Sequence, residues 1–123
     1  MAKAAHVKFE VSKELAARVY EALTVVRESG KTRKGVNETT KAIEKGIAKL
    51  VVIAEDVDPP EIVMHLPLLC KEKQAPYVYV PSKLELGKAI GIGVQTSSIA
   101  VVDEGEAKGL IEQITSETVK LSG

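Results

Sequence analysis

The sequence predicts an α/β fold: a single-domain, three-layer α/β/α sandwich around a mixed or mostly parallel sheet of about four strands. Segments with helical spacing of apolar residues alternate along the chain with short β-branched runs, which places helices on both faces of a sheet. The 123 residues suit one domain with a substantial core, and the composition, 45% hydrophobic and 28% charged, is that of a globular protein. With one Phe and three Tyr, the core is expected to be aliphatic throughout.

The first element of this fold is an amphipathic helix. Residues 1–10 are short and mixed in character, and we expect them to be a poorly fixed end. Ser12 is the expected N-cap of a helix over residues 13–28, and Gly30 follows its last turn.

A short strand is expected over residues 31–36, followed by a second helix over residues 37–47. Asn37 is the expected N-cap of this helix, because an asparagine side chain accepts hydrogen bonds from first-turn N–H groups. Ile43 and Ile47 share one side of the helix and are expected in the core.

The middle of the chain predicts a covered strand and a third helix. Residues 49–54 contain a continuous apolar, β-branched run, which is typical of a strand covered on both faces. Pro59 and Pro60 can open the helix that follows, and Pro67 within it should bend or break it.

The last part of the chain predicts two strands and two helices. Residues 77–80 form another covered strand, and Ser82 caps a short helix that ends near Ala89. After a glycine-containing loop, a strand over residues 98–102 leads to a final helix over residues 105–121.

Charge is balanced overall but unevenly distributed. Lys and Arg together number 17, as do Asp and Glu, so a nucleic-acid partner would require the cations to be segregated. Residues 31–45 hold five cations and two acids, whereas acids gather in residues 55–61 and 103–106. We therefore expect the acids to lie away from a cationic edge.

Several chemistries are not supported by the sequence. Cys70 is the single cysteine, which excludes an intrachain disulfide and a cysteine-based zinc site within one chain. The acidic stretch 55–58 lacks the spacing and glycine of a calcium loop, so neither a metal nor a cofactor is expected. No apolar run approaches the length of about 18 residues needed for a membrane span, and the chain is expected to be cytoplasmic.

Two stretches have both a structural and a functional interpretation. The helix that begins near Asn37 is either a capped, solvated surface helix or a binding element that presents Glu38 and Lys41 to a nucleobase edge. The apolar side chains in residues 92–94 either fold back into the core or form a platform for bases splayed out of an RNA helix. Because ligands of open α/β sheets bind at the carboxyl ends of strands, we expect the loops before Asn37, at Asp58 and at residues 91–94 to converge.

A second class of function is also open. Gly91-x-Gly93 matches half of a dinucleotide-binding fingerprint, so the alternative is a small α/β nucleotide-binding or enzymatic domain that uses the Gly91 to Val94 loop. Neither a nucleophile with its base nor a complete phosphate loop is visible in the sequence, which favours a non-catalytic binding protein.

Three ordered motifs resemble a known family. They are Lys34-Gly35-Val36-Asn37-Glu38-Thr39-Thr40-Lys41, Ala54-Glu55-Asp56-Val57-Asp58-Pro59 and His65-Leu66-Pro67-Leu68-Leu69-Cys70. The chain resembles, from about Val11 to about Ile114, the archaeal large-subunit ribosomal protein of the seven-Ae type, a member of the kink-turn RNA-binding family. Val94 stands where eukaryotic relatives often carry a basic residue, which favours the archaeal type.

The resemblance implies a set of RNA-contacting residues. Base-contacting positions would be Asn37, Glu38, Lys41 and Asp58; backbone-contacting positions would be Arg33, Lys34, Gly35, Lys45 and Lys83; and the apolar recognition loop would be Ile92, Gly93 and Val94. The implied partners are kink-turn and kink-loop RNAs: ribosomal RNA, box C/D and H/ACA guide RNAs with their core proteins, and ribonuclease P RNA. Neither a membrane nor a small-molecule substrate is implied.

Overall fold

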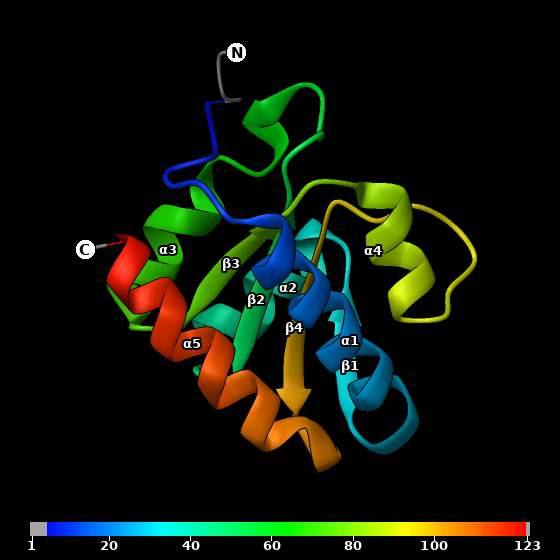
Figure 1. Cartoon of the computed structure of the whole chain (residues 1–123). Coiled ribbons are helices and arrows are strands. Elements are labelled where there is room, and N and C mark those ends of the chain that lie inside the picture. Colours follow the sequence, from blue (N-terminus) through cyan, green and yellow to red (C-terminus); the bar gives the residue numbers. More distant parts are fainter. Residues whose placement is uncertain (1–4, 123) are drawn as a thin grey trace.

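The computed structural model describes residues 5–122, and helices and strands alternate along them (Figure 1). In chain order the elements are α1 (Lys13–Ser29), β1 (Lys31–Lys34), α2 (Val36–Glu44), β2 (Leu50–Ala54), the 3-10 turn η1 (Pro60–Ile62), α3 (His65–Lys73), β3 (Tyr77–Val80), α4 (Lys83–Ala89), β4 (Ser98–Asp103), the 3-10 turn η2 (Gly105–Ala107) and α5 (Lys108–Ser122). No helix among these residues is both long enough and apolar enough to cross a bilayer.

The four strands form one mixed sheet in the order β1-β4-β2-β3. β2 and β3 are parallel, whereas β4 is antiparallel to both of its neighbours, β1 and β2. The predicted mixed sheet is confirmed, and the prediction that it could be mostly parallel is wrong. α4 spans only about 10 Å at 1.5 Å per residue, so the chain does not cross back over the sheet before it enters β4.

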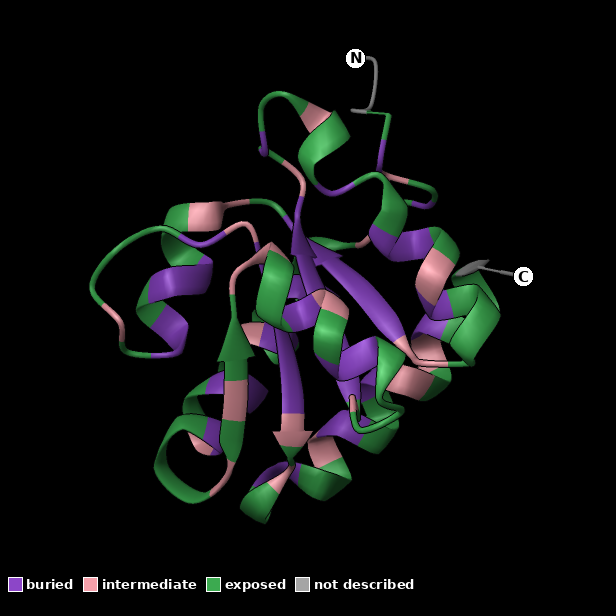
Figure 2. Ribbon diagram, turned by 180° about the vertical axis from the view of Figure 1, so that it is seen from behind, coloured by how far each residue is buried: buried purple, intermediate pink, exposed green. Residues whose placement is uncertain are grey.

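Helices cover both faces of the sheet, which confirms the three-layer sandwich. α1 and α5 pack together on one face, with α4 beside α1, and α2 and α3 pack together on the other (Figures 1 and 2). Every residue of β2 and β3 is buried, as expected of apolar strands covered on both sides. These strands form the purple centre of the molecule in Figure 2.

The described part of the N-terminal stretch is fixed to the sheet rather than loose. The imidazole of His6 is fully buried, and its Nε2 lies 2.8 Å from the carbonyl oxygen of Ala54, to which it must donate. Phe9 packs on the rings of Tyr77 and Tyr79 at centroid distances of 5.6 and 5.0 Å. The expectation of a poorly fixed end is therefore wrong for residues 5–10, while residues 1–4 lie outside the described part of the chain.

This contact also corrects the expectation of an entirely aliphatic core. Most of the core is Val, Ile, Leu and Ala, but the buried rings of Phe9, Tyr77 and Tyr79 form an aromatic cluster on β3. The few aromatic residues of the chain are concentrated here, because the N-terminal segment covers a strand that carries two of the three tyrosines.

The second helix begins and ends earlier than predicted. Its N-cap is Gly35, not Asn37, and Asn37 lies inside the first turn. The helix ends at Glu44, because the backbone of Gly46 has a φ of +74° that an α-helix cannot continue through. Ile43 is fully buried as predicted, whereas Ile47 lies beyond the helix and is 39% exposed.

Pro67 neither bends nor breaks the third helix. It is the third residue of α3, where a backbone N–H would have no acceptor within the helix. The missing N–H of proline therefore removes no helical hydrogen bond. The predicted single helix is interrupted instead at Val63 and Met64, between η1 and α3. The predicted final helix likewise starts as the 3-10 turn η2 and continues as α5.

Candidate nucleic-acid interface

Three strands end, and the fourth begins, at one edge of the sheet. The pairing of Lys34 with Ile99 and of Ile53 with Ser98 brings the ends of β1 and β2 to the start of β4. β3 runs parallel to β2 and ends at the same level. We call this side of the sheet the carboxyl edge; the loops at Gly35 and at residues 55–59, 81–82 and 90–97 leave or enter strands there.

Backbone hydrogen bonds tie these loops together. The N–H of Gly35 donates to the carbonyl of Ser98 at 2.8 Å. The N–H of Ala54, the last residue of β2, donates to the carbonyl of Ser97 at 2.9 Å. The predicted convergence is therefore confirmed for the strand ends that these loops leave or enter.

The start of α2 is an exposed set of donors at this edge. Gly35 has a φ of +86° and a ψ of 160°, and no side chain caps the helix. The first N–H groups of a helix have no intrahelical partner, and they carry the positive end of the helix dipole. The first N–H groups of α2 therefore have no side-chain cap at the carboxyl edge.

The four predicted base-contacting side chains are all exposed to solvent. Asn37 and Glu38 lie in the first turn of α2, and Lys41 follows one turn later on the same side of the helix. Asp58 lies in the loop that leaves β2 at the carboxyl edge. Buried Thr39 links α2 to β4, because its hydroxyl accepts a hydrogen bond from Ser98 Oγ at 3.4 Å.

The predicted backbone-contacting cations are spread more widely. Arg33 and Lys34 are consecutive residues of the edge strand β1, so their side chains point to opposite faces of the sheet. Lys83 begins α4 at the carboxyl edge, whereas Lys45 caps the far end of α2, about 12 Å along the helix axis from Asn37. Within residues 5–122 none of these cations, nor Lys41, forms an ion pair.

The acids are only partly separated from the cations. Asp103 lies opposite Lys31 in the β1–β4 register, so the cluster at residues 103–106 is remote from the carboxyl edge but adjoins one cation of residues 31–45. The stretch 55–58, however, lies at that edge, which corrects the prediction that both clusters lie elsewhere. Asp56 is engaged there: its Oδ1 accepts from the N–H of Lys83 at 2.8 Å.

The apolar side chains of residues 92–94 are predicted either to fold into the core or to be available to bases, and the structure shows one of each. Ile92 is partly buried and packs against the core, so the structural interpretation holds for this residue. Val94 is 62% exposed at the other side of Gly93, whose φ of +72° turns the chain outward. One apolar side chain of the loop is therefore available to a partner.

Asp56 and Gly87 are two residues of this edge that sequence reasoning missed. Asp56 links the loop after β2 to α4, as described above. Gly87 is buried inside α4, and a Cβ built there would lie 1.8 Å from the carbonyl oxygen of Val94. A glycine in the interior of a short helix was the signal available in the sequence.

The glycine-containing loop lacks the context of a dinucleotide-binding turn. That turn follows a strand and opens a helix, whereas residues 90–97 follow α4 and open β4. The loop thus supplies no helix N-terminus for a pyrophosphate, and the enzymatic alternative gains no support from it.

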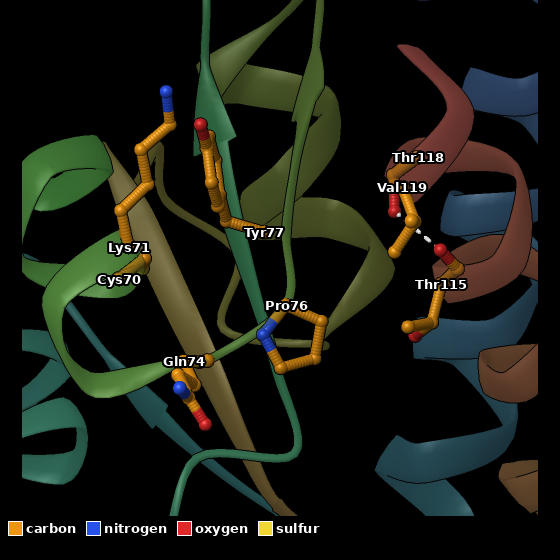
Figure 3. A pocket seen from close by; sticks show the side chains of 9 residues that line it. Cys70, Lys71, Gln74, Pro76, Tyr77, Thr115, Thr118 and Val119 are labelled. Atoms are coloured by element: carbon orange, nitrogen blue, oxygen red, sulfur yellow. Dashed lines mark hydrogen bonds between the residues drawn. The ribbon is translucent and has the colours of Figure 1, made fainter. Parts of the chain in front are cut away.

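Other reactive groups lie elsewhere or are shielded. Burial raises the pKa of the Cys70 thiol to about 12, which keeps it protonated. Cys70 borders a pocket of about 280 Å³ between α3, β3 and α5, at the start of β3 and so at the end of this strand opposite the carboxyl edge (Figure 3). The Tyr77 side chain also lines this pocket, but its hydroxyl oxygen is sealed from solvent. Within residues 5–122 no three His, Cys, Asp or Glu side chains gather to hold a metal ion.

The chain is similar to proteins already described. The model of the "Ribosomal protein L7Ae/L30e/S12e/Gadd45 family" matches residues 17–111. Among solved structures, the Giardia lamblia 15.5kD RNA binding protein superposes with a TM-score of 0.87. The two sequences are 30% identical, and the match covers 97% of this chain and 98% of that one.

Proposed function

Because the chain belongs to the ribosomal protein L7Ae/L30e/S12e/Gadd45 family, we propose that it is a non-catalytic RNA-binding protein that recognises and stabilises kink-turn and kink-loop RNA. The RNA-binding name of the Giardia lamblia structure supports the general activity. The main support from the chain itself is that the start of α2, which no side chain caps, and the loops that carry Asp58 and Val94 all adjoin one edge of the sheet.

The polar groups at this edge are proposed to contact the edges of the tandem sheared G·A pairs in a kink-turn. In the proposed complex, the amide of Asn37 donates to and accepts from a guanine. Glu38 or Asp58 accepts from guanine N–H groups, and Lys41 donates to guanine O6 or N7. A regular duplex does not present these base edges in the same way, since its major groove is deep and narrow and RNA is read mostly at irregular, unstacked places.

The cations and the helix start are proposed to hold the phosphates. Lys34 and Lys83 flank the edge, and the N–H groups that follow Gly35 favour an anion. Arg33 and Lys45 are proposed to contact phosphates from the adjoining surfaces. These contacts position the RNA without reading its sequence.

Val94 is proposed to cover the nucleotide that flips out at the kink. Its exposed isopropyl group offers aliphatic surface to a base or sugar, while Ile92 anchors the start of the loop in the core and Gly93 supplies the turn. The apolar surface at the RNA site is therefore small and local.

The proposed particles follow from the same class of RNA. We place the protein in a large ribosomal subunit of the archaeal type, bound to ribosomal RNA. Box C/D and H/ACA guide ribonucleoproteins, with their core proteins, and ribonuclease P are the further proposed assemblies, because their RNAs carry kink-turns or kink-loops.

A binding titration tests the proposal directly. The parent protein is expected to bind a kink-turn hairpin far more tightly than the same hairpin with its G·A pairs disrupted, at one fixed salt concentration. Asn37→Ala or Glu38→Ala is expected to weaken binding by about 1–3 kcal/mol. Gln113→Ala, which removes an exposed amide from α5, is the matched control and should bind like the parent. Equal binding of bent and straight RNA by the parent would overturn the proposal.

Lys45→Ala tests the distinction between residues that recognise base edges and residues that contact phosphates. Because Lys45 lies at the far end of α2, its removal should lower the salt dependence of binding, by about one unit of log-log slope. The preference for the intact kink-turn over the disrupted hairpin should stay as in the parent. Titrations at several salt concentrations provide both quantities.

A further inference from the structure

α4 and the loop that follows it are joined at both ends. At the start of the loop, the N–H of Ile92 donates to the carbonyl of Gly87 at 3.2 Å. Near its end, the N–H of Thr96 donates to the carbonyl of Lys83 at 3.1 Å. Residues 90–97, which we call the recognition loop, therefore fold back along the helix that precedes them, as Figure 1 shows for the yellow segment.

The middle of the recognition loop touches the backbone of α4 at Gly87. A Cβ at this residue would lie 1.8 Å from the carbonyl oxygen of Val94, 2.8 Å from its carbonyl carbon and 3.3 Å from Cα of Gln95. All three atoms are backbone atoms, which cannot rotate away as the end of a side chain can. The loop can pass this close to α4 only because residue 87 is glycine.

Two further contacts hold the loop from other sides. A Cβ at Gly91 would lie 2.6 Å from Cδ of Arg27, so the side chain of this α1 residue lies directly against the loop. Thr96 is buried, and its hydroxyl donates to the carbonyl of Ser98 at 3.1 Å. The recognition loop is thus held by α4, by α1 and by the start of β4.

We propose that Gly87 is a positioning residue for RNA binding: it sets the place of Val94 relative to Lys83 and keeps the apolar part of the site preformed. This inference rests on the proposed function. The contact of Gly87 is with the backbone of Val94, and the same short helix carries Lys83 at its start. One glycine therefore determines the spacing between a proposed phosphate contact and the proposed apolar contact, and a preformed loop avoids the entropy loss of ordering it on binding.

Gly87→Ala is the informative substitution, because its two effects have opposite signs. Alanine favours a helix over glycine, so α4 itself would gain stability. The added methyl group, however, must move from 1.8 Å to at least 3.0 Å from the Val94 oxygen, and either the loop or the helix must shift. We expect the affinity for the kink-turn hairpin to fall by about tenfold or more, because contacts fixed on the two elements no longer fit together.

Gly109→Ala is the matched control. Gly109 lies in α5, and a Cβ there would meet nothing within 4 Å. This variant also replaces a helical glycine by alanine, but without a clash, so it should bind RNA like the parent and melt at the same temperature or slightly higher. Binding is compared well below the melting temperature of every variant.

A double-mutant cycle separates positioning from a general loss of structure. Val94→Ala removes most of the side chain that Gly87 is proposed to place, so adding Gly87→Ala to it should weaken binding by less than Gly87→Ala does in the parent. Independent losses that simply multiply would overturn the inference, as would parent-like binding by Gly87→Ala. A parent that fails to distinguish kinked from straight RNA would instead overturn the proposed function.

A measurement on the unmodified chain covers the case in which Gly87→Ala does not fold. Backbone ¹⁵N relaxation of the free protein should give order parameters of about 0.85 for residues 92–96, as in rigid structure. Values below about 0.6 that rise on addition of the hairpin would show that RNA orders the loop, and the inference would fail.

Discussion

Gly35 joins β1 to α2 in a backbone conformation that other residues avoid. Its φ of +86° with a ψ of 160° lies in a region that is almost restricted to glycine. In this conformation its N–H reaches the carbonyl of Ser98, and its carbonyl accepts from the N–H of Thr39 at 3.0 Å. A single residue thus ends a strand, starts a helix and links both to β4.

Gly35→Ala is expected to lower the free energy of unfolding by about 1–3 kcal/mol. A Cβ at this position would meet nothing within 4 Å, so the loss would come from backbone strain and not from a clash. Urea titrations measure the effect. Gly109→Ala, which lacks the positive φ, should not lose stability, and a Gly35→Ala protein as stable as the parent would contradict the prediction.

At the scale of single residues, the sequence predicts what is encoded locally. Ser12 and Ser82 cap α1 and α4 as expected, with their hydroxyls accepting from the N–H groups of Leu15 and Glu85. The cap of α2 is misplaced, because Asn37 is a good N-cap by chemistry while the positive φ of Gly35 depends on a hydrogen bond to a strand more than sixty residues away.

The N-terminal segment acts as a covering element for β3. The hydroxyl of Tyr79 donates to the carbonyl of His6 at 2.7 Å and accepts from the N–H of Lys8 at 3.1 Å. Two residues along the same strand, the buried hydroxyl of Tyr77 has no hydrogen-bond partner within residues 5–122. Two neighbouring tyrosines therefore contribute differently to stability.

Tyr79→Phe is expected to lower the free energy of unfolding by about 1–3 kcal/mol, because it leaves two backbone groups of the N-terminal segment without a partner. Tyr77→Phe should be neutral or stabilising, since it removes a buried hydroxyl that is not hydrogen-bonded. Thermal and urea unfolding of both variants measure the difference. A larger loss in Tyr77→Phe than in Tyr79→Phe would show that the contacts are assigned incorrectly.

At the scale of elements, the spacing of apolar residues identifies the helices and strands. It does not identify segments without regular structure that pack on the sheet. The covered strands β2 and β3 are predicted from their apolar runs and are fully buried. The segment at residues 5–10 carries no periodic pattern, so its role could not be predicted: its anchors, His6 and Phe9, are single residues whose partners lie more than 45 positions away. The sequence predicts a break at Pro67 and not before α3 for a similar reason. Proline is tolerated in the first turn of a helix, and the sequence does not show where the first turn of α3 lies.

Buried acidic protons make the whole molecule sensitive to alkali. Burial raises the pKa of the Cys70 thiol from 9.0 to about 12, and desolvation raises the pKa of the hydroxyls of Tyr20, Tyr77 and Tyr79 above 10.0. The unfolded chain therefore releases these protons at a lower pH than the folded chain does. Their contribution to stability is complete below about pH 9 and is lost as the pH rises above it.

We expect the free energy of unfolding to fall above about pH 9, with a slope of about 1.4 kcal/mol per pH unit for each proton that only the unfolded chain has released. Cys70→Ala should begin this decline at a higher pH, because the thiol has the lowest unfolded pKa of the four groups. Urea midpoints between pH 7 and pH 11 measure both curves. A midpoint that stays constant from pH 8 to pH 10.5 would contradict the prediction.

At the scale of the whole molecule, the alternation of helices and strands predicts the three layers. It does not predict that β4 runs antiparallel to its neighbours. The same strand explains the site: β4 starts at the carboxyl edge, and its first residues pair with the ends of β1 and β2. The general rule for open sheets therefore predicts that the loops lie at one edge, while the prediction that the acids of residues 55–58 lie elsewhere is wrong. Charge counts along a sequence do not show which loops a sheet brings together.

The position of β4 has a consequence for synthesis of the protein. In the order β1-β4-β2-β3, the last strand to be translated lies between the first and the second. A nascent chain that has not yet emerged beyond Asp103 has no partner for β1 and no support for the turn at Gly35. The N-terminal elements therefore lack a strand partner on the translating ribosome, and the surface proposed to hold RNA can form only after β4 has emerged.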